Sequence, residues 1–261
     1  MNLFFSIRSL NRRPFYAVFA LFVGILALTT TVPAQGGPPM ITDDTETVPT
    51  GHWEINSAFT IERGADGRLF GSPLVDFNYG LSEHFQLKVE IPWLVLHNNG
   101  QRGINGLGNT NIGVRWRFRD EKKGHRIALS MYPAIEFNNP TKSVRRALVD
   151  KGPDFLMPIQ WQTTIGKFGI NGDVGYRVKR GPDEMIYGAV VGRELNESIE
   201  ILGEIHGTGP RQNLSDSEVV YNFGSRVRLT NHLTLLLSAG KSVRRNFDPR
   251  FIGYGGVQIT F

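Results

Sequence analysis

The chain has 261 residues, of which 20% are charged, and a formal net charge of +5 at pH 7. It contains no cysteine, which excludes a lipid anchor on cysteine, a disulfide framework and a thiolate metal site. Three arginines and no acids lie in the first 34 positions, so the remainder has 26 basic against 24 acidic residues, a net charge of only +2. This balance argues against nucleic acid as a partner.

The first 34 residues have the three parts of a cleavable signal peptide. Three arginines precede the apolar stretch from Phe15 to Leu28, and the small residues Val32 and Ala34 follow it. The apolar stretch is about 14 residues long, shorter than the roughly 20 that a spanning helix needs. We therefore expect export and cleavage near Ala34.

Residues 35–50 lack the apolar content of a core. They hold three prolines, and three acids lie close together at Asp43, Asp44 and Glu46. A calcium loop would need a different spacing and a bidentate final ligand. The composition indicates an extended, solvated segment that lies in the periplasm or enters a barrel lumen.

Residues 51–261 alternate between apolar and polar positions, which is the period of a β-strand with two different faces. The stretch NIGVRWRF is typical, because Val114, Trp116 and Phe118 share one face while Arg115 and Arg117 share the other. About twelve such stretches begin near Gly51, Leu69, His84, Gly108, Arg126, Pro153, Phe168, Asp183, Ile199, Glu218, Leu233 and Phe251.

The connections between these stretches alternate in length. Short turns such as GLSEH, GK and TNH take turns with longer segments near residues 96–107, 138–152 and 207–217. Short periplasmic turns and long outer loops are typical of outer-membrane barrels, whereas a soluble sandwich has no reason to alternate them. The sequence therefore predicts an all-β fold, a transmembrane antiparallel up-and-down β-barrel of about 12 strands in the cell outer membrane, surrounded by outer-membrane lipid.

In such a barrel, the charged side chains of the polar faces must point into the lumen. Their signs are mixed, which fits either a polar passage or a bore closed by ion pairs. The predicted lumen-lining residues are Glu54, Asp76, Lys88, Glu90, Arg115, Arg117, Asp173, Arg177, Glu200, Glu204, Arg226 and Arg228.

The last strand ends on an aromatic residue. Val257, Ile259 and Phe261 share one face of the final stretch YGGVQITF. We interpret these three residues as the signal that the barrel-assembly machinery recognises. The alternative is an aromatic side chain that only lies in the interfacial girdle.

Candidate catalytic and metal-binding groups are weak. Ser82, Glu83 and His84 lie together in a predicted periplasmic turn, where such residues are ordinary turn chemistry. His206 shares the polar face of a strand with Glu200 and Glu204, which favours a lumen hydrogen-bond network over a metal site. We expect no catalytic residues, no metal, no cofactor and no enzymatic activity.

Several stretches, taken in order, resemble the outer-membrane transporter family named for the meta-pathway of phenol degradation. They are ITDDTETVPTGHWEI, DFNYGLSEHFQLKVEIPW, GLGNTNIGVRWRF and YPAIEF. The similarity covers most of the chain from about Pro38 to Phe261, although the chain has Asn109 where the family has aspartate. The resemblance implies a transporter of hydrophobic or aromatic compounds.

The leading hypothesis is therefore a passive outer-membrane transport protein or channel for small solutes. One alternative is a closed barrel that serves adhesion or envelope structure. A less favoured alternative is a lipid-modifying outer-membrane enzyme. The sequence does not name the solute.

Overall fold

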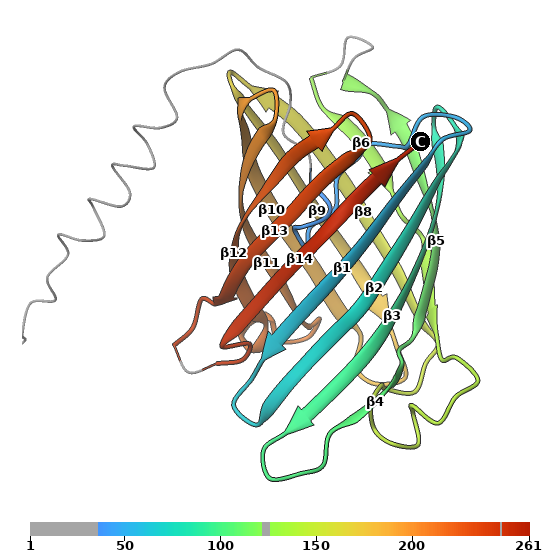
Figure 1. Ribbon diagram of the computed structural model, residues 1–261, viewed down its shortest axis with the longest axis vertical. Coiled ribbons are helices and arrows are strands. Elements are labelled where there is room, and N and C mark those ends of the chain that lie inside the picture. The colour runs from blue at the N-terminus through green and yellow to red at the C-terminus, as the bar shows by residue number, and fades with distance from the viewer. Residues whose placement is uncertain (1–35, 122–125, 246) are drawn as a thin grey trace, which may run out of the picture.

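The protein forms a closed antiparallel β-barrel in the computed structural model (Figure 1). The structure describes residues 36–121, 126–245 and 247–261, so the predicted signal peptide, residues 1–34, lies outside the described part. No helix within these ranges is long and apolar enough to cross a membrane. The one 3-10 helix among these residues is η2, Leu214–Asp216.

Fourteen strand segments within the described residues make twelve crossings of the wall. Two crossings are each built from two segments: β4 and β5 lie in line along β3, and β6 and β7 lie in line between β5 and β8. The strands are β1 (Trp53–Arg63), β2 (Gly67–Ser82), β3 (Phe85–Asn98), β4 (Ile104–Leu107), β5 (Thr110–Arg119), β6 (Ala128–Met131), β7 (Ala134–Phe137), β8 (Asp154–Ile165), β9 (Phe168–Val178), β10 (Glu184–Asn196), β11 (Ile199–Pro210), β12 (Glu218–Thr230), β13 (Leu233–Ser242) and β14 (Phe251–Thr260).

The first and last strands close the barrel. β1 pairs with β14 over ten residues, from Glu54 opposite Thr260 to Arg63 opposite Phe251. The backbone N–H of Trp53 donates to Phe261 O at 2.8 Å, and the N–H of Phe261 donates to Trp53 O at 3.0 Å. Closure leaves no open sheet edge in lipid, where unpaired backbone groups would have no water to bond.

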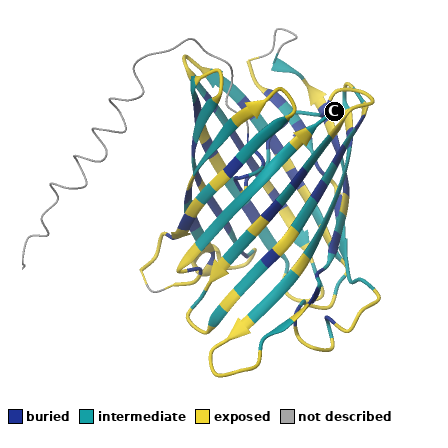
Figure 2. Cartoon of the chain, viewed as in Figure 1, coloured by how far each residue is buried: buried dark blue, intermediate teal, exposed yellow. Residues whose placement is uncertain are grey.

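The two faces of the wall are inverted relative to a soluble protein. On β5, the side chains of Trp116 and Phe118 are 43% and 46% exposed, whereas Arg115 and Arg117 are only 4% and 5% exposed. The apolar residues point outward to where lipid lies, and the charged residues point into the lumen. Figure 2 shows buried residues alternating with less buried ones along the strands.

The two ends of the barrel differ in their connections. The turns β2–β3, β8–β9, β10–β11 and β12–β13 are short and lie at the end that also holds Phe261 (Figure 1). The longer connections, including 138–153, lie at the opposite end. The predicted long loop near 96–107 is shorter than expected, because β3 continues to Asn98 and β4 returns along it.

Pairing is interrupted at several places in the wall, and the interruption in β2 involves prolines. Ser72 and Pro73 of β2 have no partner on either β1 or β3, and Pro92 of β3 lies opposite the next paired residue, Leu74. Proline has no backbone N–H, so these positions cannot donate to a ladder. The interruption therefore follows from the sequence.

Candidate functional site

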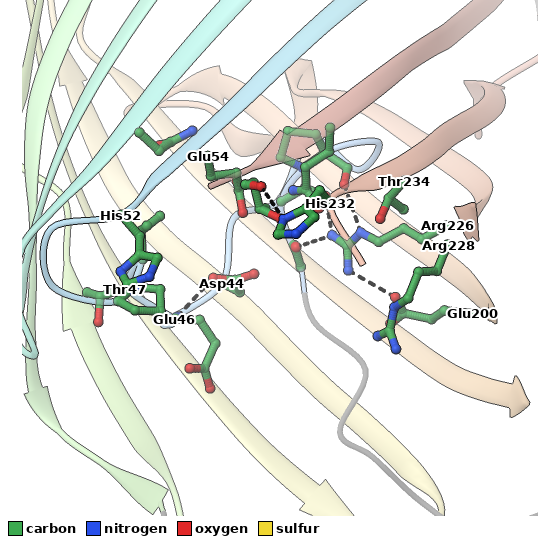
Figure 3. Close-up of a pocket in the computed structure, with 18 of the residues that line it drawn as sticks. Asp44, Glu46, Thr47, His52, Glu54, Glu200, Arg226, Arg228, His232 and Thr234 are labelled. Carbon is green, nitrogen blue, oxygen red and sulfur yellow. Dashed lines mark hydrogen bonds and ion pairs between the residues drawn. The ribbon is translucent and has the colours of Figure 1, made fainter. Parts of the chain in front are cut away.

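Residues 36–50 lie inside the barrel and are named the lumen segment. Figure 3 shows this part of the chain inside the wall, with side chains of several strands directed toward it. The segment enters from the end where β1 begins at Trp53. Its contacts to the wall are polar and come from widely separated strands.

One group of contacts comes from β11, β12 and β13. Arg226 donates to the carbonyl oxygens of Pro38, at 2.9 Å, and Gly37, at 3.0 Å, and also bonds that of Gly36. Glu204 accepts from the backbone N–H of Thr42 at 2.5 Å and of Ile41 at 3.2 Å. These bonds are charge-assisted, and the bond between Thr42 and Glu204 is buried, so they fix the backbone of the segment.

A second group comes from β5. Arg115 forms ion pairs with Asp43 and, at 3.4 Å, with Asp44. Arg117 binds both carboxylate oxygens of Glu46, at 2.7 and 3.2 Å. The interpretation of these three acids as a solvated tail is therefore wrong: they are the counter-ions of lumen arginines.

Uncharged side chains also hold the segment against the wall. Thr45 donates to Gln162 at 3.1 Å, and the N–H of Val48 donates to Gln86 at 2.9 Å. Met40 is 5% exposed and packs in a buried apolar cluster with Val190 and Leu202. The segment is thus held along most of its length.

The two neighbouring aspartates of the segment have opposite pKa shifts. Burial alone would raise the pKa of Asp43, but Arg115 and Lys88 outweigh it, and the pKa of this carboxyl lies below its usual range. Burial raises the pKa of Asp44 to about 7, with Arg115 opposing the rise and the charge of Asp43 adding to it. Like charges side by side cannot both be fully compensated by one arginine.

Among the described residues, two cavities lie in the lumen, one on each side of the segment. The larger, of about 840 Å³, lies toward the end with the short turns, where His52, Glu197 and His232 line it (Figure 3). The smaller, of about 340 Å³, lies toward the long loops and is lined by Glu62, Leu94 and others. The segment forms part of the wall of both.

The predicted lumen residues lie as follows. Seven line the larger cavity: Glu54, Asp76, Lys88, Arg115, Glu200, Arg226 and Arg228. Glu90 lines the smaller one with Asp76 and Lys88. Arg117 and Glu204 bind the segment directly, Asp173 is 7% exposed beside the segment, and Arg177 pairs with Glu136 at 3.7 Å.

Sequence reasoning missed the neutral amide side chains of the lumen. Asn56, Gln86, Gln160, Gln162 and Asn171 are all at most 3% exposed. Asn56, Gln86 and Asn171 each lie two positions from a predicted charged residue of the same strand, so the period alone could have found these three. Gln86, Gln162 and Asn171 form hydrogen bonds to the segment without adding charge.

The two residue groups considered above as catalytic or metal-binding candidates make turn and lumen contacts in the structure. Ser82, Glu83 and His84 lie at the β2–β3 turn, where the N–H of His84 donates to Ser82 Oγ at 3.3 Å. Near His206, Nδ1 lies 3.4 Å from the Thr42 hydroxyl, and Glu200 pairs with Arg226 at 3.1 Å. Within the described ranges no group of three or more His, Asp or Glu side chains is arranged to hold a metal ion.

Comparison by sequence finds no relative: no family model matches the chain, and no curated protein does. The resemblance to the phenol meta-pathway family therefore stays a prediction.

Comparison by structure finds outer-membrane barrels. The crystal structure of an outer membrane channel from Pseudomonas putida F1 matches with a TM-score of 0.62 and 12% identity, covering 84% of this chain and 98% of that one. The KdgM porin in complex with disordered oligogalacturonate matches with a TM-score of 0.58 and 10% identity, covering 80% and 99%. The NanC porin matches with a TM-score of 0.54 and 8% identity, covering 80% and 98%. The chain thus has the fold of these outer-membrane barrels.

Proposed function

We propose that the protein is a passive outer-membrane channel for small solutes, exported by its signal peptide and placed in the lipid by the barrel-assembly machinery. The observation that carries this proposal is the lumen itself: two cavities of about 840 and 340 Å³ lie in series inside a closed wall. The fold is shared with an outer membrane channel and with two porins. Channel lumens of this kind are lined by polar side chains, as here.

The lumen segment gives this channel a narrow bore. It occupies the middle of the lumen and is tied to β5, β11 and β12 by ion pairs and charge-assisted hydrogen bonds. We infer that small solutes pass only at the margin of the segment or when part of it moves. Hydrophobic or aromatic solutes, which the family resemblance implies, fit the partly apolar lining of the smaller cavity.

The same network favours the second candidate, a closed barrel without transport. If the segment never moves, its ion pairs simply fill the bore and stabilise the wall. An enzyme is the least supported reading, because Ser82 and His84 lie at a turn, where Ser82 Oγ accepts a hydrogen bond from the backbone N–H of His84.

Conductance in planar bilayers separates the two candidates. The purified protein is expected to give small, discrete ion currents, and a variant that lacks residues 36–48 is expected to give currents several-fold larger. Ion currents from the variant that lacks residues 36–48, with none from the intact protein, would support the closed barrel. Folding of both proteins is checked by heat-modifiable migration in gels.

A further inference from the structure

The smaller cavity has a polar floor made by three neighbouring strands. Asn56 of β1 lies opposite Asp76 of β2, and Asp76 lies opposite Glu90 of β3. Residues paired in this way have Cβ atoms about 4.5 to 5.5 Å apart. All three residues line the cavity, so the floor is a row of oxygen-bearing side chains.

This floor holds hydrogen-bond acceptors that lack donors. Asn56 Oδ1 and Asp76 Oδ1 are buried without a partner in the described structure, and so is Asn222 Oδ1 elsewhere in the lining of the same cavity. The amide nitrogen of Asn56 already donates to Glu54 and Asp76, at 3.3 Å each. Buried polar atoms are nearly always bonded, so these oxygens point to a missing donor.

The carboxylate of Glu90 is also available. Among the described residues, no hydrogen bond or ion pair to its side chain is formed, and the same holds for Glu62 nearer the long loops. Lys88 does not fill this role, because its Nζ lies 3.5 Å from Asp43 and 3.6 Å from Asp76. Asp43 is also paired with Arg115, so the ammonium of Lys88 stands between the two remaining carboxylates, Asp76 and Glu90, which leaves the floor negative.

Apolar side chains form another part of the cavity lining. Leu69 and Leu74 of β2, Leu94 of β3 and Ile252 of β14 line it, and Met40 of the lumen segment adds to them. A volume of about 340 Å³ lies within the usual size of small-molecule sites, which combine apolar walls with a few polar groups. A ligand that satisfies both parts has a cationic donor head and a short apolar body.

We propose that this cavity binds a small amphipathic ammonium, whose head bonds Asn56, Asp76 and Glu90 and whose apolar body lies against Leu74 and Leu94. A primary ammonium offers three donors and no acceptor, which matches a floor of acceptors. A carboxylate of the same length would face two like charges, and an alcohol has a single donor. This proposal adds a solute class to the channel proposed above. Binding of the ligand does not depend on that function, and only its passage through the barrel rests on it.

Binding to the protein in lipid nanodiscs tests the site. Titration calorimetry compares hexylammonium with 1-hexanol, hexanoate and methylammonium, each corrected with empty nanodiscs. Hexylammonium is expected to bind at least tenfold more tightly than the other three. Equal binding of hexanol or hexanoate would overturn the cationic head, and equal binding of methylammonium would overturn the apolar contact.

Two variants and a control place the ligand. Glu90→Gln should weaken hexylammonium binding at least tenfold, whereas Glu218→Gln, an acid of β12 outside this cavity lining, should change it less than twofold. Unchanged binding in Glu90→Gln would overturn the assignment. If that variant does not assemble, Leu94→Ala decides, because it should weaken hexylammonium but leave methylammonium unchanged, and no effect would count against the site. Binding without any ion current would contradict the channel and leave this site intact.

Discussion

Arg226 bonds the backbone of three consecutive residues of the lumen segment, Gly36, Gly37 and Pro38. Hydrogen bonds to charged groups contribute roughly 1.5 to 3 kcal/mol each. The loss of one such bond corresponds to a roughly ten- to hundredfold change, so Arg226→Ala, which removes three, is expected to increase the released fraction of the segment at least that much. The native chain has no cysteine, so Thr45→Cys, at a fully buried position, reports release by its rate of labelling with a maleimide.

The control for this experiment is Arg228→Ala. Arg228 lines the same larger cavity but makes no hydrogen bond or ion pair to the segment in the described structure. Its loss should leave the labelling rate of Thr45→Cys nearly unchanged. Equal acceleration by both variants would mean that general lumen charge, not the bonds of Arg226, holds the segment.

Asp44 makes the seating of the segment depend on pH. Its pKa in the seated state is about 7, against a usual value of 3.8, so the seated state favours the protonated form. Seating should weaken as pH rises from about 4 to 7 and stay constant above that range. The groups that face Asp44 are Arg115 of β5, Arg226 of β12 and, on the segment itself, Asp43 and Glu46.

The lowered pKa of Asp43 acts in the opposite sense, because its charged form is favoured and its contribution is lost only below pH 4. Labelling of Thr45→Cys between pH 5.5 and 8 should therefore speed up with pH, after correction for thiol ionisation on a free peptide. Asp44→Asn should flatten the profile. A steep profile that persists in Asp44→Asn would refute the role of this carboxyl.

At the scale of the strand, β5 offers the clearest test of face assignment. Val114 and Trp116 point outward, and a cation at the middle of the lipid face costs about 2 to 4 kcal/mol. Val114→Arg together with Trp116→Arg should greatly lower the yield of heat-modifiable barrel. Arg117→Ser, on the inward face, should assemble, with loss of its bonds to Glu46. The reverse outcome would invert the register of the wall.

Two proposed roles of the end of the last strand, assembly signal and barrel closure, are separable by mutation. Phe261 is 59% exposed, and its backbone bonds Trp53 of β1. Phe261→Ala keeps the backbone pair, whereas deletion of Phe261 removes both the ring and the pair. If the ring is the assembly signal, both variants should fold poorly in cells, as heat-modifiable yield measures. A defect in the deletion alone would assign the role to closure of the barrel.

The strands could be predicted because the membrane demands a period of two, and this period is clear in strands such as β5 and β8. The position of the lumen segment could not. Its prolines and acids have the composition of a solvated segment, and its partners are distant in sequence: Arg115 is 71 residues from Asp44, and Arg226 is 190 residues from Gly36. The acids at 43, 44 and 46 have the charge that the lumen arginines need as counter-ions. The sequence alone does not show which of the lumen charges form pairs.

For the whole molecule, the predicted cleavage site lies close to Gly36, the first described residue of the lumen segment. Its carbonyl oxygen is bonded to Arg226, two residues beyond the predicted cleavage site at Ala34. We expect protein isolated from outer membranes to begin at Gln35, as sequencing of its N-terminus would show. Intact Met1 on folded barrels would contradict cleavage.

In the channel proposed above, the lumen segment separates two spaces that a permeating ion crosses one after the other, like resistors in series. Resistances in series add, so the narrow margin around the segment sets the total current, and the wider cavities add little. Substitutions in the lining of the smaller cavity, such as Leu94→Ala, should then change which ions or amines dwell in the lumen while leaving the single-channel conductance nearly the same. Preference and throughput are therefore controlled at different places along the bore.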